Sequence, residues 1–365
     1  MGAHEEFPKF EIAASEEEAQ EQLHAARMTD GLPVVVPTRE RVDAMVLASG
    51  LDGDISLGNV GPSMAAATVN AVAANAVMAG CLPEHFPVVV AAVKAICHPT
   101  FDLTETQVTT HPITPLLIVN GPARQQCGLH YGTGACGPGF RANATIGRAI
   151  RLIMINIGGG IPGVSDNATL GSPAKYSFCI AENEEESPWE PLHVSRGWRA
   201  DQSTVTALSV EGAHSVICSP MPDAYVDIAV PAAIRLISNA VNALGSNSTY
   251  VGKGDLAVII NPSTAKMLAN AGYTREKLQR ALVEECRYTR GFLRRHNPLI
   301  VPPGPDDEYP PMRDPKTVVI AVSGSIGGYV MVCPTLGISK HHHPSVTEEI
   351  QINQFCEIPL PPQPN

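Results

Sequence analysis

The fold is decided by the stretch Leu116-Leu117-Ile118-Val119-Asn120-Gly121-Pro122. Four consecutive apolar residues followed by Asn-Gly-Pro predict a buried strand that ends in a turn. A glycine-rich loop over residues 128–139 comes next, and the sequence from 141 to 157 then predicts a helix. Short apolar strands alternate with longer helices along the rest of the chain. We therefore expect an α/β fold built around a mixed sheet.

A second unit resembles this one. Gly61-Pro62 precedes a predicted helix over 64–79, as Gly137-Pro138 precedes the helix over 141–157, and each helix runs to a glycine, Gly80 or Gly158. A weaker third echo begins at Asn261-Pro262. One interpretation is an internal duplication. The other is convergence, because proline at the start of a helix is common in unrelated proteins.

The remaining elements complete a two-part organisation. We expect an N-terminal arm over 1–30, a first α/β half over 31–165, a second half over 166–340 and a C-terminal tail over 341–365. The expected strands are 32–37, 176–181, 204–211, 215–219, 256–260, 318–322 and 329–333, and the other main helices are 38–49, 84–96, 226–244 and 274–290.

Composition and charge narrow the class of protein. The chain has 365 residues, 44% apolar and 17% charged, with 31 Gly, 32 Pro and a net charge of -11. The acidic balance opposes binding to nucleic acid. No apolar run approaches the roughly 20 residues that span a bilayer, and the start lacks a signal-peptide pattern, so we expect a cytoplasmic protein with no membrane partner. The low surface charge predicts a homo-oligomer.

The nine cysteines contain no Cys-x-x-Cys pair. A disulfide framework or a four-thiolate zinc site would show tighter, paired spacing. We expect most of these thiols to pack as small buried residues.

The glycine-rich loop is the first candidate site. A loop that leads into a helix exposes backbone N–H groups near the positive end of the helix dipole, which suits an anion. We expect Gly134 and Gly137 to offer such groups, and Arg141 and Asn143 to add side-chain donors for a small-molecule substrate. The loop is not a Walker loop. The alternative is a tight structural turn.

Cys136 lies within this loop. A thiol at a helix N-terminus has a lowered pKa, so Cys136 is the candidate nucleophile and should be alkylated faster than the other cysteines. The alternative is an inert, packed cysteine.

The second candidate site follows the strand that ends at Ala181. Carboxylates at the exit of an apolar strand are costly unless they are solvated or paired, and burial tunes their pKa values for proton transfer. We expect Glu182, Glu185 and His193 to act as acid and base groups, with Trp189 as an apolar wall. The alternative is a solvated acidic loop.

A third candidate is a divalent-metal site at His341, His342 and His343. Adjacent side chains on a strand point to opposite faces, so at most two of the three can bind one ion. Carboxylates, other histidines or a cysteine would complete the site.

Three strings carry a resemblance to a known family. They are Asn75-Ala76-Val77-Met78-Ala79-Gly80-Cys81-Leu82-Pro83-Glu84, Arg141-Ala142-Asn143-Ala144-Thr145-Ile146-Gly147-Arg148-Ala149 and Ala181-Glu182-Asn183-Glu184-Glu185 with Ser187-Pro188-Trp189-Glu190-Pro191-Leu192-His193. Over roughly 30–335 the chain resembles the bacterial UGSC-type (seleno)proteins. It lacks the Cys-Gly-Ser-Cys module that names the family, and the resemblance implies that Cys136 is a specialisation, since an aromatic residue is frequent there. The resemblance implies a fold and a site region, and no particular reaction.

Three hypotheses of function follow. The first is a hydrolase or lyase that acts on a small polar or anionic molecule through glutamate and histidine acid–base groups, with Cys136 as a possible nucleophile. Under this hypothesis, Glu182→Gln should abolish turnover and leave the fold intact. The second is a metal-dependent hydrolase or hydro-lyase. The third is a non-catalytic, thiol-bearing assembly protein.

Overall fold

The computed structural model describes residues 15–218, 226–251, 254–285, 287–309, 314–335 and 344–352. Its first sheet has four strands in the order β10-β5-β3-β4. Strand β3 (Thr114–Asn120) pairs in parallel with β4 (Cys179–Ala181) and antiparallel with β5 (Thr204–Val210), and β10 (Val346–Glu349) lies antiparallel to β5. The apolar run at 116–119 is thus the centre of this sheet.

The second sheet repeats this arrangement in the order β6-β9-β7-β8. Strand β7 (Leu256–Ile260) is parallel to β8 (Val318–Val322) and antiparallel to β9 (Tyr329–Cys333), and β6 (His214–Ile217) pairs antiparallel with β9. Each sheet receives its outer strand, β6 or β10, from the chain that leaves the other sheet. The two sheets are therefore tied together by exchanged strands.

The sheets pack against each other through one face. Alternate residues of a strand face opposite sides, so Leu116 and Ile118 of β3 join the core between the sheets, whereas Leu117 and Val119 face the helices. Ala257 and Ile259 of β7 line the same inner core from the other sheet. Every residue of β3, β5, β7 and β8 is buried, which explains the uninterrupted apolar sequences of β7 and β8.

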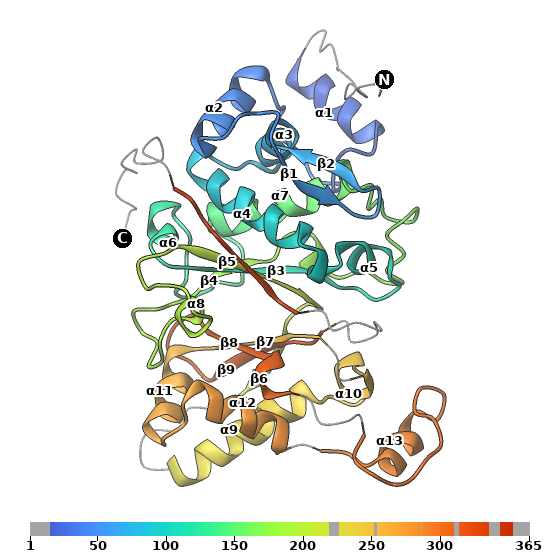
Figure 1. The fold of residues 1–365 in the computed structure, drawn as a ribbon, viewed down its shortest axis with the longest axis vertical. Helices are drawn as coiled ribbons and strands as arrows, with labels where there is room; N and C mark the ends of the chain where they lie inside the picture. Colours follow the sequence, from blue (N-terminus) through green and yellow to red (C-terminus); the bar gives the residue numbers. More distant parts are fainter. Residues whose placement is uncertain are drawn as a thin grey trace.

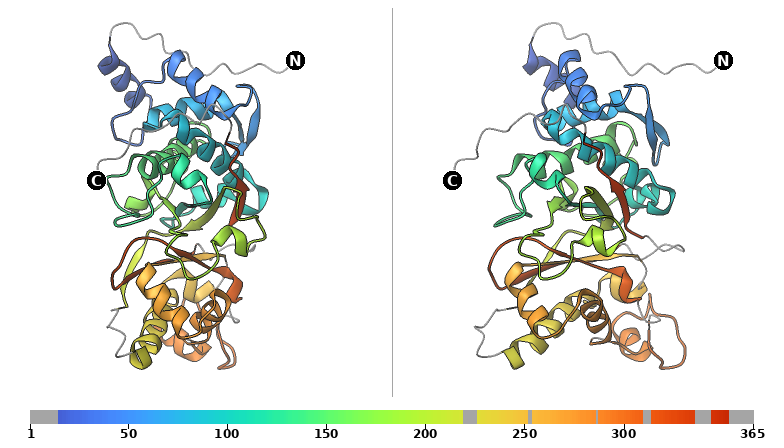
Figure 2. Two further views of the ribbon diagram at one scale, coloured as in Figure 1. Left: turned by 90° about the vertical axis from the view of Figure 1, so that its left-hand side faces the viewer. Right: turned by 60° about the vertical axis from the view of Figure 1, so that its left-hand side comes forward.

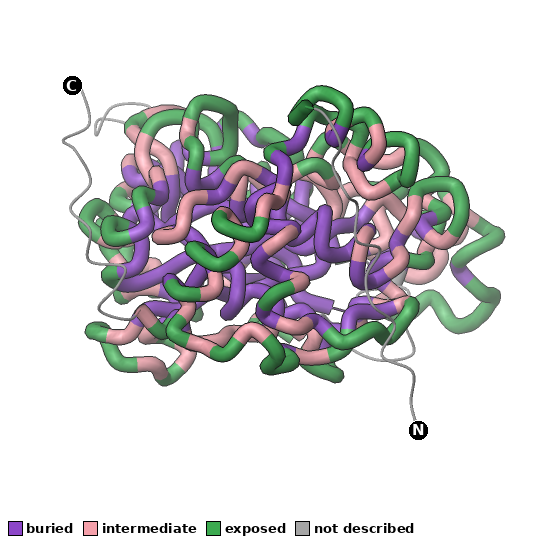
Figure 3. The backbone as a smooth tube through the Cα atoms, turned by 90° about the horizontal axis from the view of Figure 1, so that it is seen from above, coloured by how far each residue is buried: buried purple, intermediate pink, exposed green. Residues whose placement is uncertain are grey.

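Helices cover the outer faces of both sheets. Helices α4 (Phe86–Cys97) and α7 (Arg141–Asn156) cover the first sheet, and α3 (Val69–Ala79) packs against α7. Helices α9 (Val226–Val241), α11 (Pro262–Asn270) and α12 (Arg275–Glu284) cover the second sheet, so the layers run helix, sheet, sheet, helix (Figures 1 and 2). Buried residues occupy the interior of these layers, and exposed loops surround them (Figure 3).

Shorter elements complete the chain. They are α1 (Glu16–Ala25), α2 (Arg39–Ser49), β1 (Ser56–Val60), β2 (Ala65–Thr68), α5 (Leu103–Val108), α6 (Ala123–Gln126), α8 (Leu192–Ser195), α10 (Asn247–Val251) and α13 (Arg290–His296). Single-turn helices occur at Pro83–His85, Pro99–Phe101, Pro173–Lys175 and Pro315–Thr317.

The α/β fold with mixed sheets is confirmed, and five details of the organisation are corrected. Residues 32–37 form no strand and are an irregular segment before α2. Residues 65–68 form β2, paired with β1, and the helix begins only after Thr68, whose side chain caps it. The boundary at 165 falls between β3 and β4, which are partners in one sheet. The expected arm contains α1, whose Ala19 and Leu23 are buried, and the expected tail supplies β10 to the first sheet.

The topology of the two sheets identifies a different pair of similar units from the pair expected from the sequence. The units that match in topology are β3–β5 and β7–β9, rather than the segments that start at Gly61 and Gly137. An evolutionary duplication stays a prediction.

The length and apolar composition of the helices bear on whether any of them could cross a membrane. Within the described ranges, no single helix combines the length and apolar composition needed to cross a membrane. The segments Pro83–Cys97 and Pro99–Val108 meet these criteria only together, and they are bent by 67° relative to each other.

Candidate functional site

The ends of strands from both sheets meet at one edge of the molecule. The backbone N–H of Asn183, two residues beyond β4, donates to the carbonyl of Val322 at 2.7 Å, and the Ser323 hydroxyl donates to the carbonyl of Ala181 at 2.9 Å. Strand β3 ends beside them at Asn120, because β3 and β4 are parallel. In α/β proteins such carboxyl ends of strands are where ligands bind.

Glu182 lies at the centre of this edge and is fully buried. One carboxylate oxygen accepts hydrogen bonds from the Asn120 side chain and from the backbone N–H of Leu192 at 2.7 Å. The other accepts from the backbone N–H of Val322 at 3.3 Å and from Arg275 Nη2 at 3.4 Å. Burial raises the pKa of Glu182, and the Arg275 charge and these hydrogen bonds offset part of that rise.

Arg275 is the buried cation that faces Glu182. It is the first residue of α12, which Thr274 caps, and only 4% of its surface is exposed. Its Nε and Nη1 groups have no hydrogen-bond partner within the described part of the chain. Because guanidinium N–H groups make strong, charge-assisted hydrogen bonds to carboxylates and phosphates, each of these donors suits an anion.

His193 lies in α8, directly after Leu192, whose N–H is held by Glu182. The side chain is fully buried, and Nδ1 lies 3.8 Å from Glu184 Oε1. Neither ring nitrogen makes a hydrogen bond to any residue that the structure describes. A buried imidazole with both nitrogens unpaired is uncommon, and it is the side chain best suited to moving a proton near neutral pH.

Arg124 stabilises the loop over residues 182–190, which we call the carboxylate loop. Its guanidinium donates to Glu184 Oε2 at 3.0 Å, to both oxygens of Glu185 and to the backbone carbonyl of Glu182 at 2.7 Å. The hydrogen bonds from Arg124 lower the pKa of Glu185, which keeps that carboxylate ionised. Glu185 is therefore tied to Arg124 rather than directed at the unpaired donors of Arg275 and His193.

Trp189 anchors the same loop against the second sheet's helices. Its Nε1 donates to the carbonyl of Tyr273 at 2.9 Å, two residues before Arg275. The indole packs on the outer core formed by residues such as Leu268 and Leu278. Trp189 thus fixes the distance between the carboxylate loop and the start of α12.

The glycine-rich loop reaches this edge without forming the expected anion cradle. The N–H of Gly324 donates to the carbonyl of Tyr131 at 2.9 Å, so the loop touches the end of β8. The N–H of Gly137 is spent on a turn to the carbonyl of Gly134. Asn143 is buried and holds the loop through both backbone groups of His130, and Arg141 instead donates to the carbonyl of Gly80 at 3.1 Å.

Cys136 differs from its predicted environment. Helix α7 begins at Arg141, five residues beyond the cysteine, with Phe140 at its N-cap. Although Cys136 as a residue is exposed, the protein atoms around its thiol raise the pKa to about 11. The expected lowering of the thiol pKa is thus contradicted, because the thiol is desolvated and lies upstream of the helix terminus.

We therefore expect slow alkylation of Cys136 at neutral pH. A rise of the pKa from 9.0 to about 11 lowers the thiolate fraction about a hundredfold. Labelling with iodoacetamide, followed by peptide mass spectrometry between pH 7 and 10, should show a rate that increases about tenfold per pH unit. A rate at Cys136 that is already at its plateau at pH 8 would contradict this.

The predicted metal site is outside what the structure describes, since residues 341–343 are not among the described ranges. Within those ranges no three His, Cys, Asp or Glu side chains are grouped as ligands for a metal ion. The metal-dependent and assembly hypotheses stay predictions.

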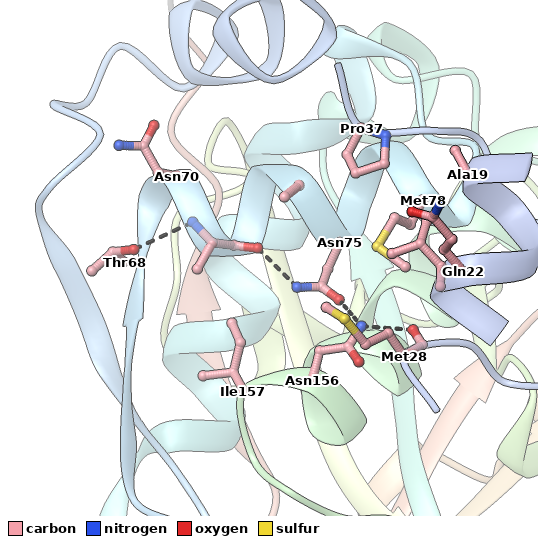
Figure 4. A pocket seen from close by; sticks show the side chains of 13 residues that line it. Ala19, Gln22, Met28, Pro37, Thr68, Asn70, Asn75, Met78, Asn156 and Ile157 are labelled. Carbon is pink, nitrogen blue, oxygen red and sulfur yellow. Dashed lines mark hydrogen bonds between the residues drawn. The ribbon is translucent and has the colours of Figure 1, made fainter. Parts of the chain in front are cut away.

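Two cavities of the described chain lie away from the edge where Glu182 and His193 are found. One of about 330 Å³ lies beneath α1, and its lining residues include Asn75 and Asn156, which are hydrogen bonded to each other (Figure 4). None of its lining residues is charged. A second, of about 510 Å³, is lined by Arg151, Asp166 and Lys175, but these charges already pair with one another. Neither supplies an unpaired acid or base.

Glu182 and His193 were predicted from the sequence as site residues, whereas three residues that contact this site were not. Asn120 ends β3, Arg124 follows it in α6, and Arg275 starts α12. The turn at Asn120-Gly121-Pro122 was a local signal for the first two. Arg275 has no such signal, because it reaches Glu182 from 93 residues away.

Comparisons with protein-family models, with curated proteins and with solved structures found no match.

Proposed function

We propose that this chain is an enzyme, a hydrolase or lyase, that acts on a small anionic molecule by acid–base catalysis. The observation that supports this is the pairing, at one edge of the sheets, of a buried imidazole and a buried guanidinium that both retain unpaired nitrogens. Glu182 contacts the Arg275 guanidinium and accepts the backbone N–H of Leu192, the residue before His193. Buried polar groups are normally satisfied, and exceptions point to a functional role.

The proposed roles follow from the available atoms. Arg275 would bind the anionic group of the substrate through Nε and Nη1. His193 would donate or accept the proton, with Glu184 Oε1 lying 3.8 Å from its Nδ1. Glu182, whose pKa is raised by burial, would be the second proton-transfer group and holds both Arg275 and α8 in place. Cytoplasmic residence and a homo-oligomeric state stay predictions.

His193→Gln is the direct test of this proposal. Glu182→Gln is less suitable, because an amide nitrogen would face two donors at either position, so that substitution should disturb the fold. We expect His193→Gln to lower kcat at least a hundredfold, the usual contribution of a general acid or base being about 100- to 10,000-fold. The assay is a panel of carboxylate-bearing esters, amides and 3-hydroxy acids, each run against its neutral carboxamide analogue.

Glu190→Gln is the matched control. Glu190 is exposed in the same loop, so its substitution should leave both kcat and the thermal unfolding temperature unchanged. His193→Gln that unfolds at the wild-type temperature and keeps the wild-type rate would refute the proposed role. A preference for the neutral analogues would refute the role of Arg275.

A further inference from the structure

A third cavity, whose charge is unbalanced, lies on the helix-covered side of the first sheet. It has a volume of about 220 Å³ and lies among α2, the end of α3 and the start of α7. It is lined by Val35, Arg41, Ala44, Met45, Val77, Gly80, Cys81, Leu82, Pro83 and Arg141. We call it the arginine pocket. Its walls are apolar except for the two guanidinium groups, and Glu182 is separated from it, since it faces the second sheet.

Arg141 gives the arginine pocket its free donors. Its Nε donates to the carbonyl of Gly80, which fixes the plane of the guanidinium, and it forms no ion pair with any described residue. Arg141 is exposed and its two terminal nitrogens make no hydrogen bond to a described residue, so they are accessible to a dissolved anion. Arg41 is held by the carbonyl of Val36 at 2.9 Å and by Glu16 at 2.8 Å, and Glu16 is exposed.

The positive charge of Arg141 favours a lower pKa in two neighbouring titratable groups, His85 and Cys81. Burial, the dominant effect, and Arg141 together lower the pKa of His85 to about 4, so this imidazole is neutral at pH 7. Burial raises the pKa of Cys81 to about 12 against the opposing effect of Arg141, so this thiol is protonated. Neither group supplies the negative charge that would balance Arg141.

We propose that the arginine pocket binds a small carboxylate. The carboxylate oxygens would accept two parallel hydrogen bonds from Arg141, the geometry in which guanidinium groups recognise this group best. The short hydrocarbon body would lie against Val77, Leu82 and Met45. Ligand pockets usually measure about 300–1,000 Å³, so a cavity of this size favours a ligand of only a few carbon atoms.

Calorimetry with butyrate and butyramide tests the proposal on the whole chain. Butyrate should bind, and butyramide, which has nearly the same shape without the charge, should bind at least tenfold more weakly. Arg141→Gln should weaken butyrate binding at least tenfold. Arg39→Gln should not, because Arg39 lies on the exposed side of α2 and pairs with Asp43 alone. His193→Gln should also bind butyrate normally, which separates this site from the proposed catalytic one.

A second pair of variants tests the arginine pocket if Arg141→Gln does not fold. Ala44 is exposed at its rim, so Ala44→Glu should fold and should place a carboxylate that competes for the guanidinium groups. Butyrate binding should fall at least tenfold in Ala44→Glu and persist in Ala44→Gln. Wild-type affinity in both Arg141→Gln and Ala44→Glu, or equal binding of butyramide, would overturn the proposal. Tighter binding of inorganic phosphate than of butyrate, lost in Arg141→Gln, would overturn the assignment to carboxylates.

Discussion

Arg275→Met lowers the free energy of unfolding by about 3–5 kcal/mol at pH 7, the range found when one partner of a buried ion pair is removed. Methionine fills much of the arginine's volume, so the loss comes chiefly from charge. Glu182 is fully buried and keeps its hydrogen bonds from Asn120, Leu192 and Val322 in the variant. It then has no cation to offset the cost of burying the carboxylate.

The loss should depend on pH in a defined direction. Burial already raises the pKa of Glu182 above its ordinary value of 4.5. A carboxyl group with a raised pKa in the folded state contributes most stability below pH 4.5, and that contribution decreases as the pH rises through the folded-state pKa. Arg275→Met raises the pKa further. The difference between variant and wild type is therefore small in acid and increases as the pH rises above the raised folded-state pKa of the wild-type Glu182.

Urea unfolding at pH 4.5 and pH 7 measures this difference. Arg235→Met is the matched control, because Arg235 forms an exposed ion pair with Glu285 at 3.1 Å. Exposed pairs contribute about 0–1 kcal/mol, so this control should change stability little at either pH. An Arg275→Met variant equally destabilised at both pH values would show that lost packing, rather than charge, explains the effect.

The strands of the two inner sheets could be predicted because their burial is complete. Residues 116–119, 256–260 and 318–322 are apolar on both faces, and this needs no knowledge of the partner strand. Strand β10 has the sequence Val346-Thr347-Glu348-Glu349 and no comparable pattern, since it is a half-buried edge strand. Its membership of the first sheet depends on where the chain returns after β9, which local sequence does not specify.

The residues of the candidate site were likewise predictable from the sequence only in part. Glu182 and His193 could be found because carboxylates directly after a buried strand require partners. The partners themselves come from distant segments, Arg124 from 58 residues before Glu182 and Arg275 from 93 residues after it. The pKa of Cys136 was predicted wrongly although the helix begins at Arg141, as expected. Cys136 lies five residues upstream of that terminus, and burial of its thiol instead raises the pKa.

Gly121→Ala is the substitution expected to disturb both the fold and the site. Gly121 has φ +79°, a left-handed conformation that costs other residues about 1–2 kcal/mol. A Cβ atom there would also overlap the carbonyl oxygen of Gln202 and approach the Cα of Ser203 to 2.8 Å. These are backbone atoms next to β5 and cannot rotate away. We expect a total loss of about 2–5 kcal/mol, since overpacking adds about 1–3 kcal/mol.

Gly163→Ala separates the two causes of that loss. Gly163 has φ +74°, but it is exposed, and a Cβ atom there would meet no described atom within 4 Å. It should therefore lose only the conformational part, about 1–2 kcal/mol. Urea unfolding of both variants gives the difference. Equal losses would mean that the segment at Gln202 yields readily to the new methyl group.

The second effect of Gly121→Ala should appear in activity. The N–H of Gly121 donates to Glu184 Oε1 at 2.7 Å, and this same oxygen is the one 3.8 Å from His193 Nδ1. Moving Gly121 away from Gln202 therefore moves the carboxylate that lies beside the proposed proton-transfer group. In the substrate panel, kcat should fall in Gly121→Ala under conditions where the variant is still folded, and stay unchanged in Gly163→Ala. A folded Gly121→Ala variant with wild-type kcat would show that the hydrogen bond from Gly121 to Glu184 Oε1 is not needed for turnover.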